Sequence, residues 1–118
     1  MKNVELDFSL PAIRYAIDMC QEYPQYHVGI VVDADADFAH AKKMSCGNMA
    51  LEYVDVLKFD GWRKPEVGAH TIRFKNGSAV YITTSEDTAR GYLWNMLICE
   101  PTLDKKAHNK ARCWLRAR

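Results

Sequence analysis

The chain has 118 residues, of which 48% are hydrophobic and 11% aromatic. This length and composition predict a single globular domain, residues 1–118, and exclude a disordered or fibrous chain. The sequence has no run of about 18 apolar residues, and its first residues lack the basic-then-apolar order of a signal peptide, so we expect a cytoplasmic location and no membrane contact.

Charge is unevenly distributed along the chain, although the net charge is only +1. Residues 1–104 carry 10 basic and 15 acidic side chains, whereas residues 105–118 carry 6 basic side chains and no acidic one. The basic residues of this last segment are Lys105, Lys106, Lys110, Arg112, Arg116 and Arg118. A basic segment attached to an acidic body is typical either of a nucleic-acid contact or of the charged face of a terminal helix.

The first predicted helix covers residues 10–23, where apolar side chains repeat with the period of an amphipathic helix. Ser9 precedes Pro11, and a serine N-cap with proline in the first turn favours a helix start at this point. Residues 27–32 then form a β-branched run without alternation. Such a run predicts a strand that is buried on both faces and central in its sheet.

A second predicted helix covers residues 36–49 and follows three alternating aspartates. Acidic residues are favoured at the start of a helix, because they interact with its free N–H groups and its dipole. The aspartates do not match a calcium loop, because Phe38 stands where that loop needs glycine and Met44 where it needs glutamate. Residues 53–59 are a candidate short strand. Residues 60–68 are predicted to be a loop from their glycine, proline and charged residues.

The next segment predicts a β-hairpin followed by a buried strand. Residues 71–74 and 80–82 alternate around Asn76-Gly77, and this dipeptide favours a type I′ turn, in which both central positions need positive φ. Residues 94–99 are an uninterrupted apolar strand that ends before Glu100. Residues 103–118 place apolar side chains on one stripe and therefore predict a basic C-terminal helix.

Together these elements predict an α/β fold: a small, mostly parallel sheet of about five strands, flanked by helices, with an Asn-Gly hairpin and a basic C-terminal helix. The cysteines are scattered and form no Cys-x-x-Cys pair, so we expect reduced structural thiols and no metal site. They are Cys20, Cys46, Cys99 and Cys113. At the end of an apolar strand, the thiol of Cys99 is expected to have a raised pKa and to be inert.

Residues 10–103 resemble the ATPase core of phage terminase large subunits and, more distantly, other P-loop motor proteins. The resemblance lies in the order of a helix, a buried strand, a helix, the Asn-Gly hairpin, Arg-Gly and an apolar strand that ends in an acid. The positions that carry it are Asn76, Gly77, Ser78, Arg90, Gly91, Cys99 and Glu100. Residues 96–100 take the place of the Walker B strand, so the resemblance makes Glu100 the counterpart of the water-activating carboxylate.

Two departures from that family remove its chemistry. A phosphate-binding loop needs G-x-x-x-x-G-K-[ST], so that backbone N–H groups and a lysine surround the phosphates, but this chain has no glycine before Gly29. Cys99 stands at the family's metal-holding aspartate position, and a thiol is a poor ligand for magnesium. No serine or histidine occurs in a recognised catalytic motif either, so we expect no cofactor and no enzyme activity.

The sequence therefore predicts a non-catalytic, phage-encoded interaction protein with a terminase-like scaffold, acting in the host cytoplasm. Such a protein would bind a macromolecular partner, and inhibition of a host or phage machine would fit it. The alternative is a nucleic-acid-binding module, in which the six basic residues of the last segment contact phosphates and Trp62 or Trp114 stacks on bases. A third hypothesis is a small enzyme that uses Glu100 with groups brought close by folding.

Overall fold

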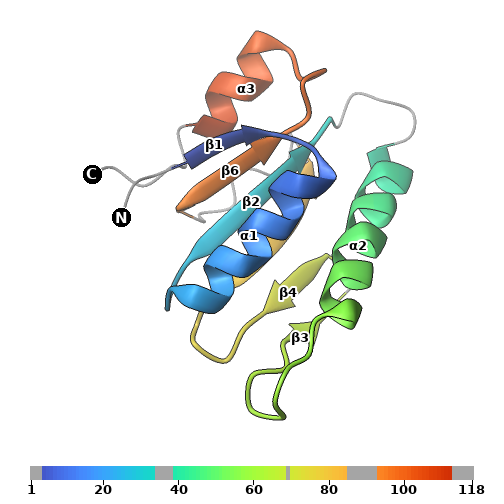
Figure 1. The fold of residues 1–118 in the computed structure, drawn as a ribbon. Coiled ribbons are helices and arrows are strands. Elements are labelled where there is room, and N and C mark those ends of the chain that lie inside the picture. The colour runs from blue at the N-terminus through green and yellow to red at the C-terminus, as the bar shows by residue number, and fades with distance from the viewer. Residues whose placement is uncertain (1–3, 34–38, 69, 85–92, 113–118) are drawn as a thin grey trace.

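The computed structural model describes residues 4–33, 39–68, 70–84 and 93–112 (Figure 1). Over these ranges six strands form one sheet, in the order β1-β6-β2-β5-β4-β3. The elements are β1 (Val4–Asp7), α1 (Leu10–Glu22), β2 (His27–Val32), α2 (Ala39–Val56), β3 (Glu66–Val67), β4 (Thr71–Arg73), β5 (Ala79–Thr84), β6 (Met96–Cys99) and α3 (Lys105–Arg112). Strands β1, β6, β2 and β5 are parallel to one another, whereas β4 pairs antiparallel with β5, and β3 pairs antiparallel with β4. This mostly parallel sheet flanked by helices confirms the predicted fold class.

Strand β2 lies in the middle of the parallel part of the sheet. It pairs with β6 on one side and with β5 on the other, and its residues from Val28 to Val32 are buried. The β-branched run has no alternation because both faces of this strand are covered. The prediction of a central strand is confirmed.

Two apolar clusters lie on opposite faces of the sheet, because successive side chains of a strand point to opposite faces. Met96 and Ile98 of β6 belong to the larger cluster with α1 and α2. Leu97 and Cys99 of the same strand belong to the smaller cluster with Ala111 of α3. Figure 1 shows α1 and α2 side by side across the sheet, with α3 at the end of the molecule where β1 and β6 lie.

The prediction of a strand at residues 53–59 is wrong, because α2 continues to Val56. Tyr53 and Val54 favour a strand by local propensity, but in the helix both side chains pack against the main core. The Tyr53 hydroxyl also donates a hydrogen bond to Asp18 of α1, at 3.0 Å. Tertiary contacts therefore decide the structure of this segment, and the helix predicted to end near Met49 is two turns longer.

The predicted type I′ turn between β4 and β5 is also wrong. Among the turn residues only Gly77 has a positive φ, 88°, whereas a type I′ turn requires positive φ at Asn76 as well. The Phe74 N–H donates to the Ser78 carbonyl at 2.8 Å, and the Gly77 N–H donates to the Phe74 carbonyl at 3.1 Å. The turn is therefore wider than two residues, with glycine in the left-handed position.

Some predictions fall outside the described residues. These include Arg90-Gly91, the start of the second predicted helix, and everything after Arg112, including Cys113, Trp114, Arg116 and Arg118. Within the described ranges, no helix has the length and apolar character needed to span a membrane.

Candidate functional site

The carboxyl ends of the four parallel strands meet at one edge of the sheet, where ligands of open α/β sheets generally bind. The favoured position lies between adjacent strands whose connections leave toward opposite faces. Here β2 leads to α2 on one face, and its neighbour β6 leads to α3 on the other. Asp33 follows β2 and Glu100 follows β6, so these two residues mark the place where a catalytic site is expected.

Both carboxylate oxygens of Glu100 are engaged at this place. Oε1 accepts a hydrogen bond from the Asp33 backbone N–H at 2.9 Å, and Oε2 accepts one from Lys42 Nζ of α2 at 3.1 Å. The Glu100 side chain is only 14% exposed, so its charge is balanced mainly by the Lys42 ammonium. This arrangement joins β6, β2 and α2, and leaves neither oxygen without a partner.

The connection between β1 and α1 consists of Phe8 and Ser9 alone. The Phe8 N–H donates to the Cys99 carbonyl at 2.8 Å, while Ser9 Oγ accepts from the Ala12 N–H at 3.1 Å. Pro11, in the first turn, has no N–H to offer. A phosphate-binding loop, which spans roughly eight residues, has no room in this connection.

The described cysteine thiols lie in the core. Cys99 packs in the smaller cluster beneath α3, and burial raises the pKa of its thiol to about 12, as the sequence predicted. Burial likewise raises the pKa of Cys20 to about 12. Over the part of the chain that the structure describes, no three His, Cys, Asp or Glu side chains gather in a way that would hold a metal ion.

Asn76, Gly77 and Ser78 lie at the opposite, amino-terminal edge of the sheet, away from Glu100. The buried Ser78 hydroxyl donates to the Tyr23 carbonyl at 2.5 Å and accepts from the Tyr26 N–H at 3.0 Å. The Asn76 amide donates to the Cys20 carbonyl at 2.9 Å. These positions therefore close the C-terminal end of α1, and the structure does not bring them together with Cys99 and Glu100.

The predicted basic surface is only partly described. Lys105 and Lys106 are exposed in the first turn of α3, and the Lys110 side chain lies outside the described atoms. Arg112 Nε instead contacts both carboxylate oxygens of Glu5 on β1, each at 3.0 Å. A phosphate contact by Arg112 would have to compete with this ion pair.

Glu5 is also in contact with His108, whose Nε2 lies 2.5 Å from Oε1 of the carboxylate. Burial alone would raise the pKa of Glu5, but the hydrogen bonds from Arg112 and His108 outweigh it and hold this pKa below its ordinary value. The contacts of Arg112 and His108 with Glu5 attach α3 to the edge strand β1.

A cleft of about 480 Å³ lies at the amino-terminal edge. It is formed by the end of α1, the loop before β3 and the turn between β4 and β5, and its lining residues are Asp18, Gln21, Glu22, Trp62, Arg63, Phe74, Lys75 and Asn76. Trp62 is 64% exposed, and the Arg63 guanidinium lies over its ring at 4.8 Å from the centroid. The sequence predicted a surface loop here, but not that α1 and the turn would complete a cleft around it.

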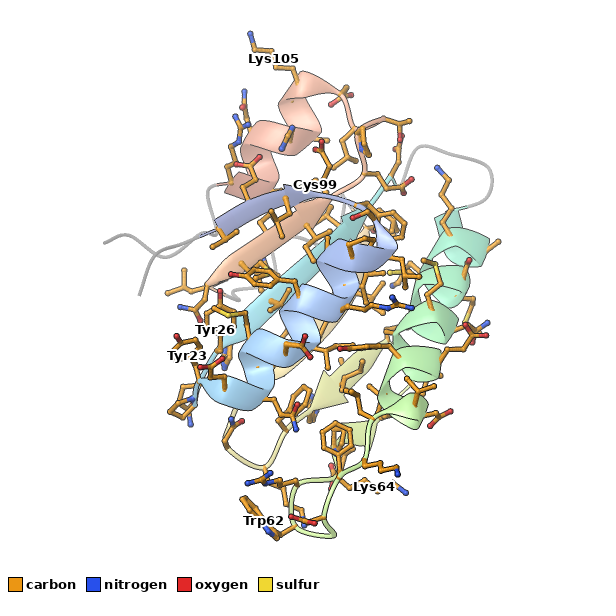
Figure 2. All side chains as sticks on the ribbon, in the orientation of Figure 1. Tyr23, Tyr26, Trp62, Lys64, Cys99 and Lys105 are labelled. Atoms are coloured by element: carbon orange, nitrogen blue, oxygen red, sulfur yellow. The ribbon has the colours of Figure 1, made fainter. Side chains whose placement is uncertain are left out.

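Figure 2 shows Trp62 and Lys105 at opposite ends of the molecule. The nucleic-acid hypothesis uses the basic segment for phosphate contacts and either Trp62 or Trp114 for base stacking. The structure does not bring these two groups together, so any stacking near α3 would have to use another side chain.

Comparison of the chain with protein-family models, curated proteins and solved structures finds no match. The resemblance to terminase ATPase cores therefore stays a prediction.

Proposed function

We propose that this chain is a non-catalytic interaction protein that binds a macromolecular partner through the cleft beside Trp62. The observation that carries the proposal is the 64% exposure of Trp62 in a formed cleft. Tryptophan and arginine are the residue types that most often dominate the free energy of protein interfaces, and here Arg63 stacks on Trp62. Together they supply an aromatic anchor at the surface.

The contacts of Glu100 support the non-catalytic part of the proposal. A general base needs access to the proton that it abstracts, but the Lys42 ammonium and the Asp33 N–H occupy the two carboxylate oxygens. The short connection at Phe8 and Ser9 argues in the same direction, because it offers no phosphate-binding loop. The terminase-like order of elements would fit a phage protein that acts on a host or phage machine.

Site-specific photo-crosslinking tests the proposal. A photoreactive phenylalanine analogue replaces Lys64, the exposed residue after Arg63, and a control protein carries it at Val56, which is exposed on α2. In lysate from infected or uninfected host cells, we expect a discrete protein adduct only from position 64. Excess unlabelled wild-type chain should suppress this adduct, and excess Trp62→Ala should not. The absence of a competed protein adduct from both lysates would contradict the proposal.

The exposed Lys105 and Lys106 favour nucleic-acid binding as a second candidate function. Both lie in the first turn of α3, which contains no acidic residue to balance them. If they contact phosphates, changing both to alanine should weaken oligonucleotide binding and reduce the salt slope by about 2. The control changes Lys58 and Lys64, which are exposed elsewhere. Binding that is absent at low salt, or equal in the two double variants, would exclude this function.

A further inference from the structure

The α1 wall of the cleft carries two carboxylates in an unfavourable position. Asp18 and Glu22 are four residues apart, so they lie on one face of the helix, where like charges repel. They also lie near the negative end of the helix dipole, and the last turn of α1 contains no basic residue. Within the described residues neither carboxylate forms an ion pair, although Asp18 accepts the Tyr53 hydroxyl hydrogen bond. This wall of the cleft therefore carries two carboxylates with no cation in ion-pair contact among the described residues.

The cationic groups of the cleft lie on its other walls and are held by their own neighbours. The Arg63 guanidinium lies over the Trp62 ring. Lys75 Nζ donates a hydrogen bond to the Gly61 carbonyl at 3.3 Å. Arg14 does not line the cleft; it lies on α1 one turn before Asp18, and its guanidinium lies over the Tyr53 ring at 5.4 Å from the centroid. Each of these cations has a local contact that does not involve a cleft carboxylate.

We infer that the cleft binds a peptide segment of the partner through an arginine or lysine side chain. Its cation would lie against Asp18 and Glu22, and its aliphatic stem would lie along Trp62 and Phe74. The inference deepens the proposed function and rests on it, because it names the chemistry of the partner at the same cleft. A volume of about 480 Å³ suits a long side chain with part of its flanking backbone.

Arginine fits this environment better than lysine. Its planar guanidinium can bind carboxylates through two parallel hydrogen bonds and also stacks on aromatic rings, whereas a lysine ammonium acts as a point charge. The exposed indole of Trp62 offers an apolar surface for the aliphatic stem of such a side chain, while its charged end reaches the carboxylates. A nucleic-acid strand fits worse, because its phosphates would approach the carboxylates of Asp18 and Glu22.

The test is a titration of the full ¹⁵N-labelled chain with short synthetic probes, followed by NMR. The probes are acetyl-Gly-Leu-Arg-Leu-Gly-amide, the same peptide with glutamate in place of arginine, arginine amide alone, and a short oligothymidine. We expect the arginine peptide to shift the amides of Gln21, Glu22 and Gly61. The glutamate peptide should leave them unchanged, and arginine amide should bind more weakly than the peptide.

Charge variants separate this inference from a general preference for peptides. The double variant Asp18→Asn/Glu22→Gln should raise the Kd of the arginine peptide about threefold to tenfold, the range for two partly exposed ion pairs. The matched control, Glu52→Gln/Asp55→Asn, removes two exposed carboxylates from α2 and should leave the Kd unchanged. Removal of two charges that repel each other should not destabilise α1. A higher Kd in the Asp18→Asn/Glu22→Gln variant can therefore be attributed to the loss of the two carboxylates from the cleft.

Equal affinity for the arginine and glutamate peptides, or an unchanged Kd in the Asp18/Glu22 variant, would overturn the inference. Binding of the oligothymidine at these amides without the arginine peptide would overturn it in favour of a nucleic acid. Equally tight binding of arginine amide would overturn the assignment to a peptide. A further outcome is that excess unlabelled wild type and excess Asp18/Glu22 variant suppress the crosslinked adduct equally well. That result would leave the proposed function standing and overturn only the charge assignment.

Discussion

The indole ring of Trp94 lies directly against the backbone of Gly29, in the middle of β2. A Cβ atom added to Gly29 would be 2.5 Å from Cε2 and 2.6 Å from Cδ2 of that ring. Trp94 is itself almost fully buried, and it belongs to the smaller core cluster with Leu97 and Leu103. The absence of a side chain at position 29 is therefore what allows the ring to cover this part of the sheet.

Gly29→Ala should destabilise the protein by about 1–3 kcal/mol, because the ring or the strand must move to admit a methyl group. Equilibrium unfolding in urea measures the change. Gly61→Ala is the control, because nothing lies within 4 Å of a Cβ at that position. A Gly29 variant as stable as the Gly61 variant would show that the ring moves away without cost.

Ser78→Ala should lower the free energy of unfolding by about 1–3 kcal/mol. The change removes the hydroxyl that donates to the Tyr23 carbonyl and accepts from the Tyr26 N–H, and it leaves both backbone groups without this partner. Ser45→Ala, on the exposed side of α2, should change stability by no more than about 0.5 kcal/mol. Equal effects at the two serines would contradict a role for Ser78 in closing α1.

Glu22→Gln should stabilise the protein by about 0.3–1 kcal/mol at low ionic strength. The substitution removes a negative charge from the C-terminal end of α1 and ends its repulsion with Asp18. Thermal unfolding at low and high salt measures the gain, which should shrink as salt screens the charges. Loss of stability in Glu22→Gln would mean that this carboxylate is already compensated.

Lys42→Met should destabilise the protein because it leaves the poorly exposed Glu100 carboxylate with one fewer partner. A double-mutant cycle with Glu100→Gln measures the coupling in urea unfolding. We expect a coupling free energy of about 1 kcal/mol or more, since the pair is partly buried. Additive effects of the two substitutions would indicate that the ion pair does not form in solution.

Acidification should weaken the attachment of α3 through Glu5. The pKa of Glu5 in the folded protein is lower than its ordinary value of 4.5, so the carboxylate stabilises the fold above that pH. This contribution is lost as the pH falls from that value through the lower folded pKa. The difference in unfolding free energy between wild type and Glu5→Gln should therefore shrink as the pH falls below 4.5. Glu66→Gln, on exposed β3, is the control, and a difference that stays constant with pH would exclude the linkage.

The elements that the sequence predicted well are those with strong local patterns. The amphipathic period over α1 and the β-branched run of β2 each have one structural solution. The local pattern around Tyr53 predicts the wrong element, because its aromatic and β-branched residues favour a strand. In the folded protein the packing of this segment against α1 and the main core stabilises a helix instead. The sequence did not predict strand β1. Its residues Val4 to Asp7 alternate between partly buried and exposed in the structure, but a pattern of only four residues is a weak signal in sequence.

The candidate sites could not be predicted because they combine distant segments. Lys42 and Glu100 are 58 residues apart in the chain, and no local pattern links them. The cleft needs the end of α1, the Trp62 loop and the turn at Asn76 to meet. In the same way, Asn76 to Ser78 were predicted to be part of a family motif, but in the structure they close the C-terminal end of α1.

The closing of α1 by a turn so far along the chain has a consequence for dynamics. Asn76 donates a hydrogen bond to the carbonyl of Cys20, 56 residues earlier in the chain, and Ser78 donates one to the carbonyl of Tyr23, 55 residues earlier. The last turn of α1 and the turn between β4 and β5 therefore cannot open independently. Their backbone amides should exchange with solvent as one cooperative unit. Because Asn76 and Glu22 also line the cleft, an occupant of the cleft would contact both halves of that unit and slow the exchange of each.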